Sequence, residues 1–294
     1  MQQLRGTGVA LITPFDAQGA LDLEALNQLV DHCIQGGVDY LVVLGTTGES
    51  ATLTADEKDR VIQQVVQKAG GQLPLVLGVG GNNTQQVIDE LKRRDLSAFD
   101  AILSVSPYYN RPSQEGIFQH YKAVAEATSK PLVLYNVPSR TGSNMLPATV
   151  LRLAHAFDHI IGIKEAAGDM TQVLRLLADR PRDFMVISGD DMLALPLVSA
   201  GGDGVISVIG QGVPRPFSDM IRMGLEGDQP SKAYQLHFDL MPLIDIIFAE
   251  GNPSGIKALL EIQGIGSAGV RLPLVQATPP LKEQLRDAFK PFSS

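Results

Sequence analysis

The sequence predicts a (β/α)8 TIM barrel over residues 1–223, followed by a small helical domain over residues 224–294. Eight short runs rich in Val, Ile and Leu recur along the first part of the chain, and stretches with helical periodicity separate them. The length of 294 residues suits a barrel with an appendage, because such barrels need about 250 residues. An open doubly wound sheet is the structural alternative, and the count of strands favours the barrel.

The predicted strands are near-continuous apolar runs. This pattern is typical of a parallel sheet that is covered on both faces, whereas a half-exposed antiparallel sheet alternates polar and apolar residues. The strands are expected at residues 8–13, 40–45, 73–80, 100–107, 131–137, 160–166, 184–190 and 204–210.

The intervening helices carry start signals. In "TADEKDRVIQQVVQKAG", Thr54 precedes an apolar periodic stretch and Glu57 follows three residues later, which is the spacing of a capping box. Beyond residue 224 the strand pattern stops and only helical periodicity continues. Pro242, Pro253 and Pro273 are expected to break or kink the helices there.

Composition limits the class of protein. The net charge of −8 and a pI near 5.1 argue against nucleic-acid binding, which needs clustered Lys and Arg. Cys33 is the only cysteine, so it is expected to be a buried apolar residue without an intrachain disulfide. The apolar stretch near residue 10 is expected to be too short for a signal peptide, and no apolar run of the sequence reaches the ~20 residues that span a membrane. We therefore expect a cytoplasmic protein without a membrane partner.

The reacting groups of such a barrel lie at the carboxyl ends of its strands. There the chain carries hydroxyls, tyrosines, an arginine and a lysine, with few carboxylates of obvious role. This combination suggests amine chemistry on an anionic carbonyl compound. The segments concerned are "GTTGES", "GVGGNN", "SPYYNRP", "YNVPSRTG", "KEA" and "SGDD".

Lys164 ends the apolar run "IIGIK". A lysine at a strand end is most often a solvated charge or the ion-pair partner of a carboxylate such as Glu165. The alternative is a Schiff-base lysine, because burial beside an apolar strand favours a neutral amine that attacks a ketone. The protonated imine then withdraws electrons while a carbon–carbon bond forms or breaks.

Tyr135 in "LYNVP" either packs its ring in the core or relays protons. A phenol is a poor base by itself, so a relay needs hydroxyl partners, which Thr46 and Thr47 can provide. The same threonines could instead only shape the turn "GTTGES". Arg140 is either an exposed loop residue or a bidentate clamp on a substrate carboxylate.

Two other patterns are rejected as sites. "GVGGNN" resembles a phosphate-binding glycine loop, but Asn83 stands where the dinucleotide fingerprint needs its third glycine. His155 and His159 have the spacing of helix-borne metal ligands, yet no third ligand is in view. We expect a partly solvated histidine pair and no metal there.

Together these segments resemble the 4-hydroxy-tetrahydrodipicolinate synthase family, also called the dihydrodipicolinate synthase family, of pyruvate-dependent class I lyases and aldolases. The resemblance runs from "GVALITPF" to the C-terminal helices and depends on "GTTGES", "SPYYNRPSQEG", "YNVPSRTG", "IKEA" and "SGDD". It implies a lyase that condenses pyruvate with L-aspartate 4-semialdehyde, a step toward lysine and diaminopimelate. It also implies that no metal or organic cofactor is needed.

The resemblance implies roles for individual residues. Lys164 resembles the lysine that forms the imine with pyruvate, and Tyr135 the acid and base. Thr46 would link Tyr135 to Tyr109, which reaches into the site of a neighbouring subunit. A shared tyrosine implies a homo-oligomer, expected to be a tetramer of two dimers. The implied substrate-binding residues are Thr47, Arg140, Gly189 and Ile206.

The resemblance also implies a regulatory site for lysine. Relatives that lysine inhibits strongly carry histidines at the positions of Ala55 and Lys58 and a glutamate at that of Gln86. Because this chain lacks those contacts, weak or absent inhibition is expected. The implied effector residues are Ser50, Ala51, Asn82, Gln86 and Tyr108.

Two other functions stay open. One is a related class I aldolase, either an N-acetylneuraminate lyase or a 2-keto-3-deoxy sugar acid aldolase, which would share Lys164 and Tyr135. Arg140 and the double threonine favour the synthase over these relatives. The other is a barrel that has lost catalysis and serves as a scaffold, against which the intact set of lysine, tyrosines and threonine argues.

Overall fold

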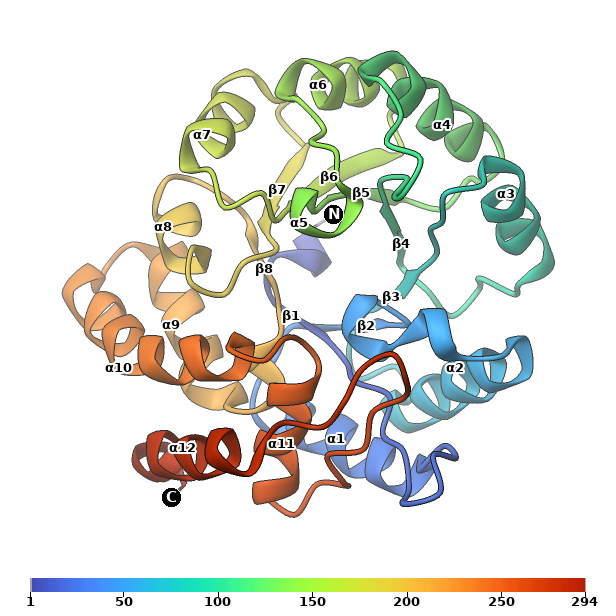
Figure 1. Ribbon diagram of the computed structural model, residues 1–294. Coiled ribbons are helices and arrows are strands. Elements are labelled where there is room, and N and C mark those ends of the chain that lie inside the picture. The colour runs from blue at the N-terminus through green and yellow to red at the C-terminus, as the bar shows by residue number, and fades with distance from the viewer. Residues whose placement is uncertain (1, 294) are drawn as a thin grey trace.

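A computed structural model describes residues 2–293 and confirms the predicted barrel. Eight parallel strands close on themselves in chain order, and the helices surround them (Figure 1). The strands are β1 Gly6–Ala10, β2 Tyr40–Val43, β3 Leu75–Gly78, β4 Ala101–Val105, β5 Leu132–Asn136, β6 Ile160–Glu165, β7 Met185–Ser188 and β8 Gly204–Ser207.

The helices of the described chain alternate with the strands and then continue alone. The barrel helices are α1 Leu23–Gln35, α2 Ala55–Ala69, α3 Thr84–Arg93, α4 Gln114–Glu126, α5 Pro138–Thr141, α6 Pro147–Ala156, α7 Met170–Asp179, α8 Ala194–Ser199 and α9 Pro214–Glu226. They are followed by α10 Pro230–Phe248, α11 Ser254–Ile262 and α12 Pro279–Phe289. Short 3-10 helices lie at Gln2–Leu4, Thr46–Gly48 (η2), Ser50–Thr52 (η3), Ile209–Gln211 (η4) and Lys290–Phe292.

Each predicted strand is present, but some end earlier than the apolar run does. Strand β8 stops at Ser207 because the Asp191 carboxylate accepts the backbone N–H groups of Val208 and Ile209, at 3.1 and 2.9 Å. Strand β1 stops at Ala10, and the N–H of Ile12 donates to the Gln211 side chain. In both cases a buried side chain replaces the neighbouring strand as acceptor.

Glycine makes the seam between β1 and β8 possible. Gly6 pairs with Gly204, and a Cβ atom on Gly204 would lie 2.0 Å from the Gly6 carbonyl oxygen. Both residues have positive φ, 106° and 146°, a conformation that side chains rarely tolerate. The closure of the barrel therefore depends on these two positions.

Apolar side chains fill the inside of the barrel. The ring of Tyr40 is fully buried there, and Gly8 makes room for it, since a Cβ on Gly8 would lie 2.2 Å from the ring. The Tyr40 hydroxyl donates to the carbonyl of Val205 at 3.3 Å. Tyr135 and Ile206 belong to the same interior cluster, so the floor of any site at the carboxyl ends is packed.

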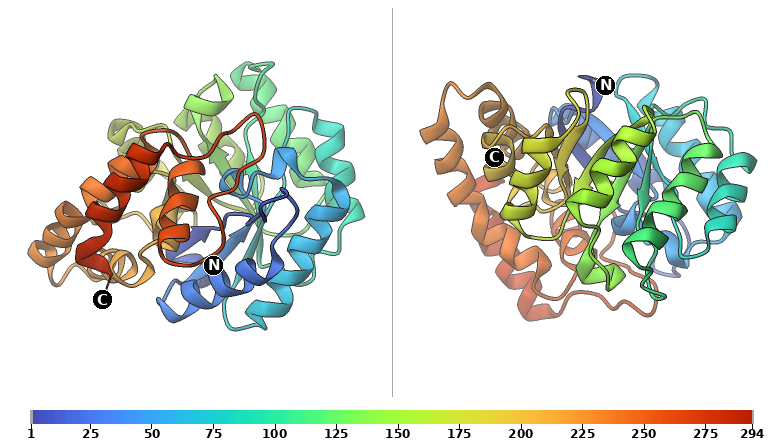
Figure 2. Two further views of the ribbon diagram at one scale, coloured as in Figure 1. Left: turned by 60° about the horizontal axis from the view of Figure 1, so that its bottom comes forward. Right: turned by 90° about the horizontal axis from the view of Figure 1, so that it is seen from above.

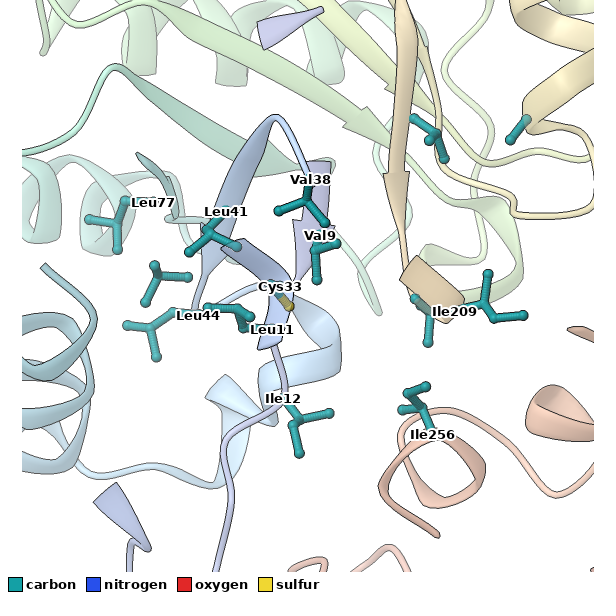
Figure 3. Packing of buried hydrophobic residues seen from close by; sticks show 14 of the residues in the cluster. Val9, Leu11, Ile12, Cys33, Val38, Leu41, Leu44, Leu77, Ile209 and Ile256 are labelled. Atoms are coloured by element: carbon teal, nitrogen blue, oxygen red, sulfur yellow. The ribbon is translucent and has the colours of Figure 1, made fainter. Parts of the chain in front are cut away.

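A second and larger core lies between the strands and the helices. Cys33 is fully buried within it, as predicted, and Figure 3 shows it among Val9, Leu11 and Val38. Burial raises the pKa of the Cys33 thiol, which keeps it in the unreactive protonated form.

The predicted capping box of α2 is present. The Thr54 side chain accepts the N–H of Glu57, and the Glu57 carboxylate accepts the N–H of Thr54. Helix α10 runs through Pro242 without a break, whereas Pro253 and Pro273 lie between helices, as predicted. The predicted boundary after residue 223 falls inside α9, and the division into two domains stays a prediction.

The C-terminal helices gather beside α9 and α1 on one side of the barrel (Figure 1). The loop after α11 turns back across the barrel end opposite the N-terminus, as the right-hand view of Figure 2 shows. No helix in residues 2–293 combines the length and the apolar character that crossing a membrane requires.

Candidate active site

A cavity of about 910 Å³ opens at the carboxyl ends of the strands. Residues after β2, β5, β6 and β7 form its floor, and residues from α10 to the loop after α11 form one wall. Nine of the predicted site residues line it: Thr46, Thr47, Ser50, Ala51, Tyr108, Tyr135, Arg140, Lys164 and Gly189. The structure thus brings most of the predicted set together.

Lys164 and Tyr135 lie side by side on neighbouring strands. The register of β5 and β6 shifts by one residue between Leu132 and Val133, and this shift places Tyr135 opposite Lys164. Without it Tyr135 would pair with Ile163, whose side chain belongs to the outer core. A local irregularity in one strand pair therefore sets the central geometry of the site.

Lys164 is 5% exposed, and its Nζ lies over the face of the Tyr135 ring, 4.4 Å from the centroid. In the described chain no carboxylate lies within ion-pair distance of that amine. The solvated lysine considered above is excluded by this burial. The ring face favours positive charge at Nζ, which an imine at this atom also carries.

Glu165 does not pair with Lys164, because it faces the opposite side of β6. Asn136 Nδ2 donates to both of its carboxylate oxygens, at 2.9 and 3.0 Å, and Gln172 Nε2 donates at 2.9 Å. Burial raises the pKa of Glu165, and these amide hydrogen bonds act against that rise. The network ties β5, β6 and α7 together directly behind Lys164.

Gly189, just after β7, leaves the space that the Lys164 side chain occupies. A Cβ atom at this position would lie 2.6 Å from Ala166 Cβ and 2.9 Å from Lys164 Cε. Any larger residue must therefore displace the lysine stem. Gly189 therefore belongs to the site because the absence of a side chain there leaves room for Lys164.

The two threonines of "GTTGES" occupy η2 and differ in their surroundings. Thr46 is exposed at the cavity, whereas Thr47 is 3% exposed. Asn252 Nδ2 donates to Thr47 Oγ1 at 2.9 Å, so this oxygen acts as an acceptor and its own proton is free to point at a ligand. Thr47 is the better donor for an anion in the cavity.

Arg140 lies in α5 at the rim and is exposed. Its Nη2 is 3.4 Å from the backbone oxygen of Asn252, to which it donates. Asn252 therefore contacts both predicted carboxylate-binding residues, Thr47 and Arg140. Asn252 could not be recognised from the sequence, because its partners lie 205 and 112 residues away and nothing in the local pattern signals them.

Asp191 is a second residue that the sequence analysis left without a role. It is 2% exposed beside the cavity and holds the end of β8 through the N–H groups of Val208 and Ile209. Burial raises the pKa of its carboxyl group to about 6, against the opposing effect of these hydrogen bonds. It shapes the wall next to Gly189.

The remaining predicted residues lie outside the cavity lining. Tyr109 is 89% exposed with φ of 72°, in the loop between β4 and α4. Ile206 is buried in the barrel interior. Asn82 and Gln86 lie at the start of α3, away from the cavity lining. The structure brings Ser50, Ala51 and Tyr108 to the cavity but not these two.

The rejected motifs have structural roles. Asn83 caps α3, and its side chain accepts the N–H groups of Gln85 and Gln86. His159 Nε2 lies 3.0 Å from the carbonyl of Ala125, and His155 is exposed on α6. Within residues 2–293, no cluster of three or more His, Cys, Asp or Glu side chains is placed to hold a metal ion.

The fold and the cavity together define a class. The barrel carries a buried amine on its sixth strand, beside a tyrosine and facing a hydroxyl-lined pocket, and no carboxylate among the described residues pairs with it. These features are typical of lysine-dependent barrel enzymes. The family model described as the dihydrodipicolinate synthetase family matches residues 3–291. The chain belongs to this family.

Individual relatives agree with this assignment. A 4-hydroxy-tetrahydrodipicolinate synthase of Flavobacterium psychrophilum is 58% identical over 285 residues, which is 97% of each chain. The crystal structure of dihydrodipicolinate synthase from Thermotoga maritima superposes with a TM-score of 0.95 at 39% identity, covering 98% of both chains. A solved structure described as the first monomeric dihydrodipicolinate synthase variant has a TM-score of 0.95 at 40% identity, covering 98% of this chain and 96% of the other.

Proposed function

We propose that this protein condenses pyruvate with L-aspartate 4-semialdehyde to give 4-hydroxy-tetrahydrodipicolinate, through a Schiff base on Lys164. The position of Lys164 supports this most directly. Its amine is buried, unpaired with any carboxylate of the described chain, and placed 4.4 Å over the Tyr135 ring inside the cavity. An amine in such a place reacts with a carbonyl group that enters.

The first half of the reaction activates pyruvate. The pyruvate carboxylate binds the turn of Thr46 and Thr47, where the Thr47 hydroxyl proton is free because its oxygen accepts from Asn252. Lys164 Nζ attacks the ketone carbon, water leaves, and a protonated imine forms. Loss of a methyl proton gives the enamine, and the Tyr135 hydroxyl transfers protons in these steps, supported by the Thr46 hydroxyl.

The second half joins the substrates. The enamine carbon attacks the aldehyde, while Arg140 at the rim binds the carboxylate of the semialdehyde. The substrate's own amine then displaces Lys164 from the imine carbon and closes the ring. The net products are the cyclic hydroxy acid and the one water lost on imine formation, so no oxidant or reductant is needed.

Consumption of pyruvate by the purified protein tests this proposal, with aspartate semialdehyde, N-acetylmannosamine and glyceraldehyde compared as partners. We expect rapid and selective turnover of the semialdehyde. Turnover only with a sugar aldehyde would keep Lys164 and Tyr135 in their roles and move the protein to the aldolases. Absence of any turnover, and of a borohydride-trapped pyruvate adduct, would support the scaffold function.

We further propose that the active unit is an oligomer that exchanges Tyr109, expected to be a tetramer of two dimers. The support is the exposure of this aromatic residue and its positive φ, a costly conformation for a tyrosine. Sedimentation of the wild type and of Tyr109→Phe, together with their turnover, tests it. A fully active wild-type monomer would contradict the exchange.

The proposal also covers inhibition by lysine, which we expect to be weak, and the cellular location of the protein. Lys58 lines the cavity and Ala55 lies on the same helix, where strongly inhibited relatives are expected to carry histidines. The lysine ammonium group would meet a like charge at Lys58. A cytoplasmic location is proposed from the acidic composition and from the single, buried cysteine.

A further inference from the structure

A buried ion pair joins the C-terminal helical region to the threonine turn. Lys257 of α11 is fully buried, Glu49 is 4% exposed, and the Lys257 ammonium donates to the Glu49 carboxylate. Glu49 directly follows η2, which carries Thr46 and Thr47. The pair therefore lies next to the turn assigned above to the pyruvate carboxylate.

Each partner of the pair is held by further contacts. Lys257 Nζ also donates to the carbonyl of Gly269 at 2.7 Å, and it lies 4.2 Å from the centroid of the Phe15 ring. The second Glu49 oxygen accepts the N–H of Arg271 at 2.9 Å. Both oxygens of the carboxylate and two of the three N–H groups of the ammonium are engaged in hydrogen bonds, so the site is one defined arrangement rather than a loose contact.

Arg271 extends this cluster to the start of α2. Its guanidinium donates to both oxygens of Glu57, at 2.6 and 2.8 Å, and its Cζ lies 4.3 Å from the centroid of the Phe15 ring. The loop after α11 is thereby fixed across the barrel, in the position that Figure 1 shows next to α2 and β2. Pro273 and Leu274 of this loop line the cavity.

Glu49 has a strained backbone that needs such support. Its φ is 51° and its ψ is 34°, a left-handed conformation that glycine adopts more easily. Its N–H donates to the Thr46 carbonyl at 3.1 Å, and its carbonyl accepts from Thr52 at 2.9 Å. The conformation of Glu49 therefore decides where the turn before it points.

We infer that the Glu49–Lys257 pair positions the threonine turn for pyruvate and holds the C-terminal wall of the cavity against it. Glu49 and Lys257 are positioning residues: Lys257 lies outside the cavity lining, and Glu49, at the cavity, has both carboxylate oxygens bound by Lys257 and by the N–H of Arg271. This inference rests on the proposed function, because it assigns the turn to the substrate carboxylate. Burial lowers the pKa of Lys257 to about 8, and the charge of Glu49 opposes that change, so the ammonium form present at neutral pH depends on its partner.

Steady-state kinetics of Lys257→Met, Glu49→Gln and the double variant test the inference. We expect the KM for pyruvate to rise about tenfold in each single variant, with a smaller change in kcat, because binding geometry is lost while the reacting groups stay. In the double variant the rise should stay near tenfold instead of multiplying, since both changes break one interaction. Pyruvate trapping by borohydride at low pyruvate should fall in parallel.

Lys282→Met is the matched control. Lys282 is ion-paired with Glu261 within the C-terminal helices at 2.7 Å, away from the cavity. Its variant should keep the wild-type KM. If Lys257→Met does not fold, as judged by circular dichroism, Glu49→Gln carries the test, because it keeps the size of the side chain.

The outcomes separate the two proposals. A folded Glu49→Gln protein with a pyruvate KM within twofold of the wild-type value would overturn the positioning role. Failure of the wild type to form any trapped pyruvate adduct would instead overturn the proposed function, whatever the variants do.

Discussion

Two buried lysines in different regions show how one side chain can serve two purposes. Lys164 on the barrel floor is 5% exposed, lies over a tyrosine ring and has no carboxylate partner in the described chain. Lys257 in the seam between α11 and the barrel is fully buried, lies over a phenylalanine ring and is paired with Glu49. Burial and an aromatic neighbour are common to both.

The difference lies in the hydrogen-bond acceptors. Lys257 donates to a carboxylate and to a backbone carbonyl, and these acceptors hold it as an ammonium, which has no lone pair for nucleophilic attack. Lys164 faces the cavity, where a bound ligand can provide the carbonyl group or hydrogen-bond acceptor that the protein itself does not place beside the amine. A buried amine is a structural cation where its acceptors are built in, and a nucleophile where they are left out.

Removing Lys164 should have the largest effect. We expect Lys164→Met to lower kcat by at least about 10³-fold and to abolish the borohydride-trapped pyruvate adduct, because it removes the buried amine beside Tyr135 that forms the imine. Thermal unfolding should stay close to that of the wild type, since within residues 2–293 no carboxylate forms an ion pair with this amine. Appreciable turnover by the purified variant would contradict the role of Lys164.

Removing Lys257 should lower the stability of the fold, whereas removing Lys164 should not. Lys257→Met leaves the Glu49 carboxylate buried without its partner, a change that costs about 3–5 kcal/mol of unfolding free energy. Urea unfolding followed by circular dichroism measures it. The double variant Glu49→Gln/Lys257→Met should recover most of the lost unfolding free energy. A Lys257→Met variant as stable as the wild type would show that the ion pair does not contribute to stability.

A methyl group at position 189 should disturb the reacting lysine and its neighbour Ala166. In Gly189→Ala the new Cβ would lie 2.9 Å from Lys164 Cε, so the amine must move, and a displacement near 1 Å costs about 10²-fold in kcat. Single-turnover measurement of imine formation locates the loss in the first step. An unchanged rate there would mean that the lysine stem has more freedom than its packing indicates.

A buried base outside the cavity provides a further comparison through pH. His120 on α4 is 4% exposed, with Nδ1 at 2.9 Å from Thr84 Oγ1, and burial lowers its pKa from 6.5 to about 4. The unfolded chain therefore binds the proton more tightly, and stability falls as pH drops below 6.5. Between pH 7 and pH 5 the unfolding free energy of the wild type should fall by about 2 kcal/mol more than that of His120→Gln.

The quantity to measure is the difference between the wild type and His120→Gln in how the unfolding free energy changes with pH. Asp191 acts with the opposite sign, because its raised pKa of about 6 makes acidification stabilising in that range. Both proteins contain Asp191, so its contribution cancels. Equal pH dependence of the two proteins would show that the His120 ring is protonated without cost.

The smallest effect is expected for a third lysine, Lys58, at the outer part of the cavity. Added lysine should inhibit turnover weakly or not at all, because Lys58 presents a like charge to the ligand. Half-maximal inhibition below millimolar lysine would contradict this. The triple variant Ala55→His, Lys58→His and Gln86→Glu should gain inhibition if these positions govern it.

Much of this architecture could be predicted from local patterns. Apolar runs located all eight strands, and Thr54 with Glu57 located the start of α2. Position at a strand end was enough to single out Lys164 and Tyr135, because a barrel gathers its strand ends at one face.

What could not be predicted depends on long-range contacts. Glu49 and Lys257 meet across 208 residues, and neither residue is distinguished by its neighbours in the chain. The register shift between β5 and β6, which aligns Tyr135 with Lys164, also has no local sign. These features are decided by packing among several elements rather than by periodicity.

The seam between β1 and β8 has a consequence for how the protein is made in the cell. Gly6 finds its partner Gly204 only after the ribosome has added 198 further residues, the difference between these two positions. At a synthesis rate of about 5–20 residues per second this takes roughly 10–40 s. Throughout that time one edge of β1 lacks its neighbour, and unpaired edges invite association with other chains. The growing polypeptide is thus exposed to aggregation along this edge until the stretch containing Gly204 has emerged.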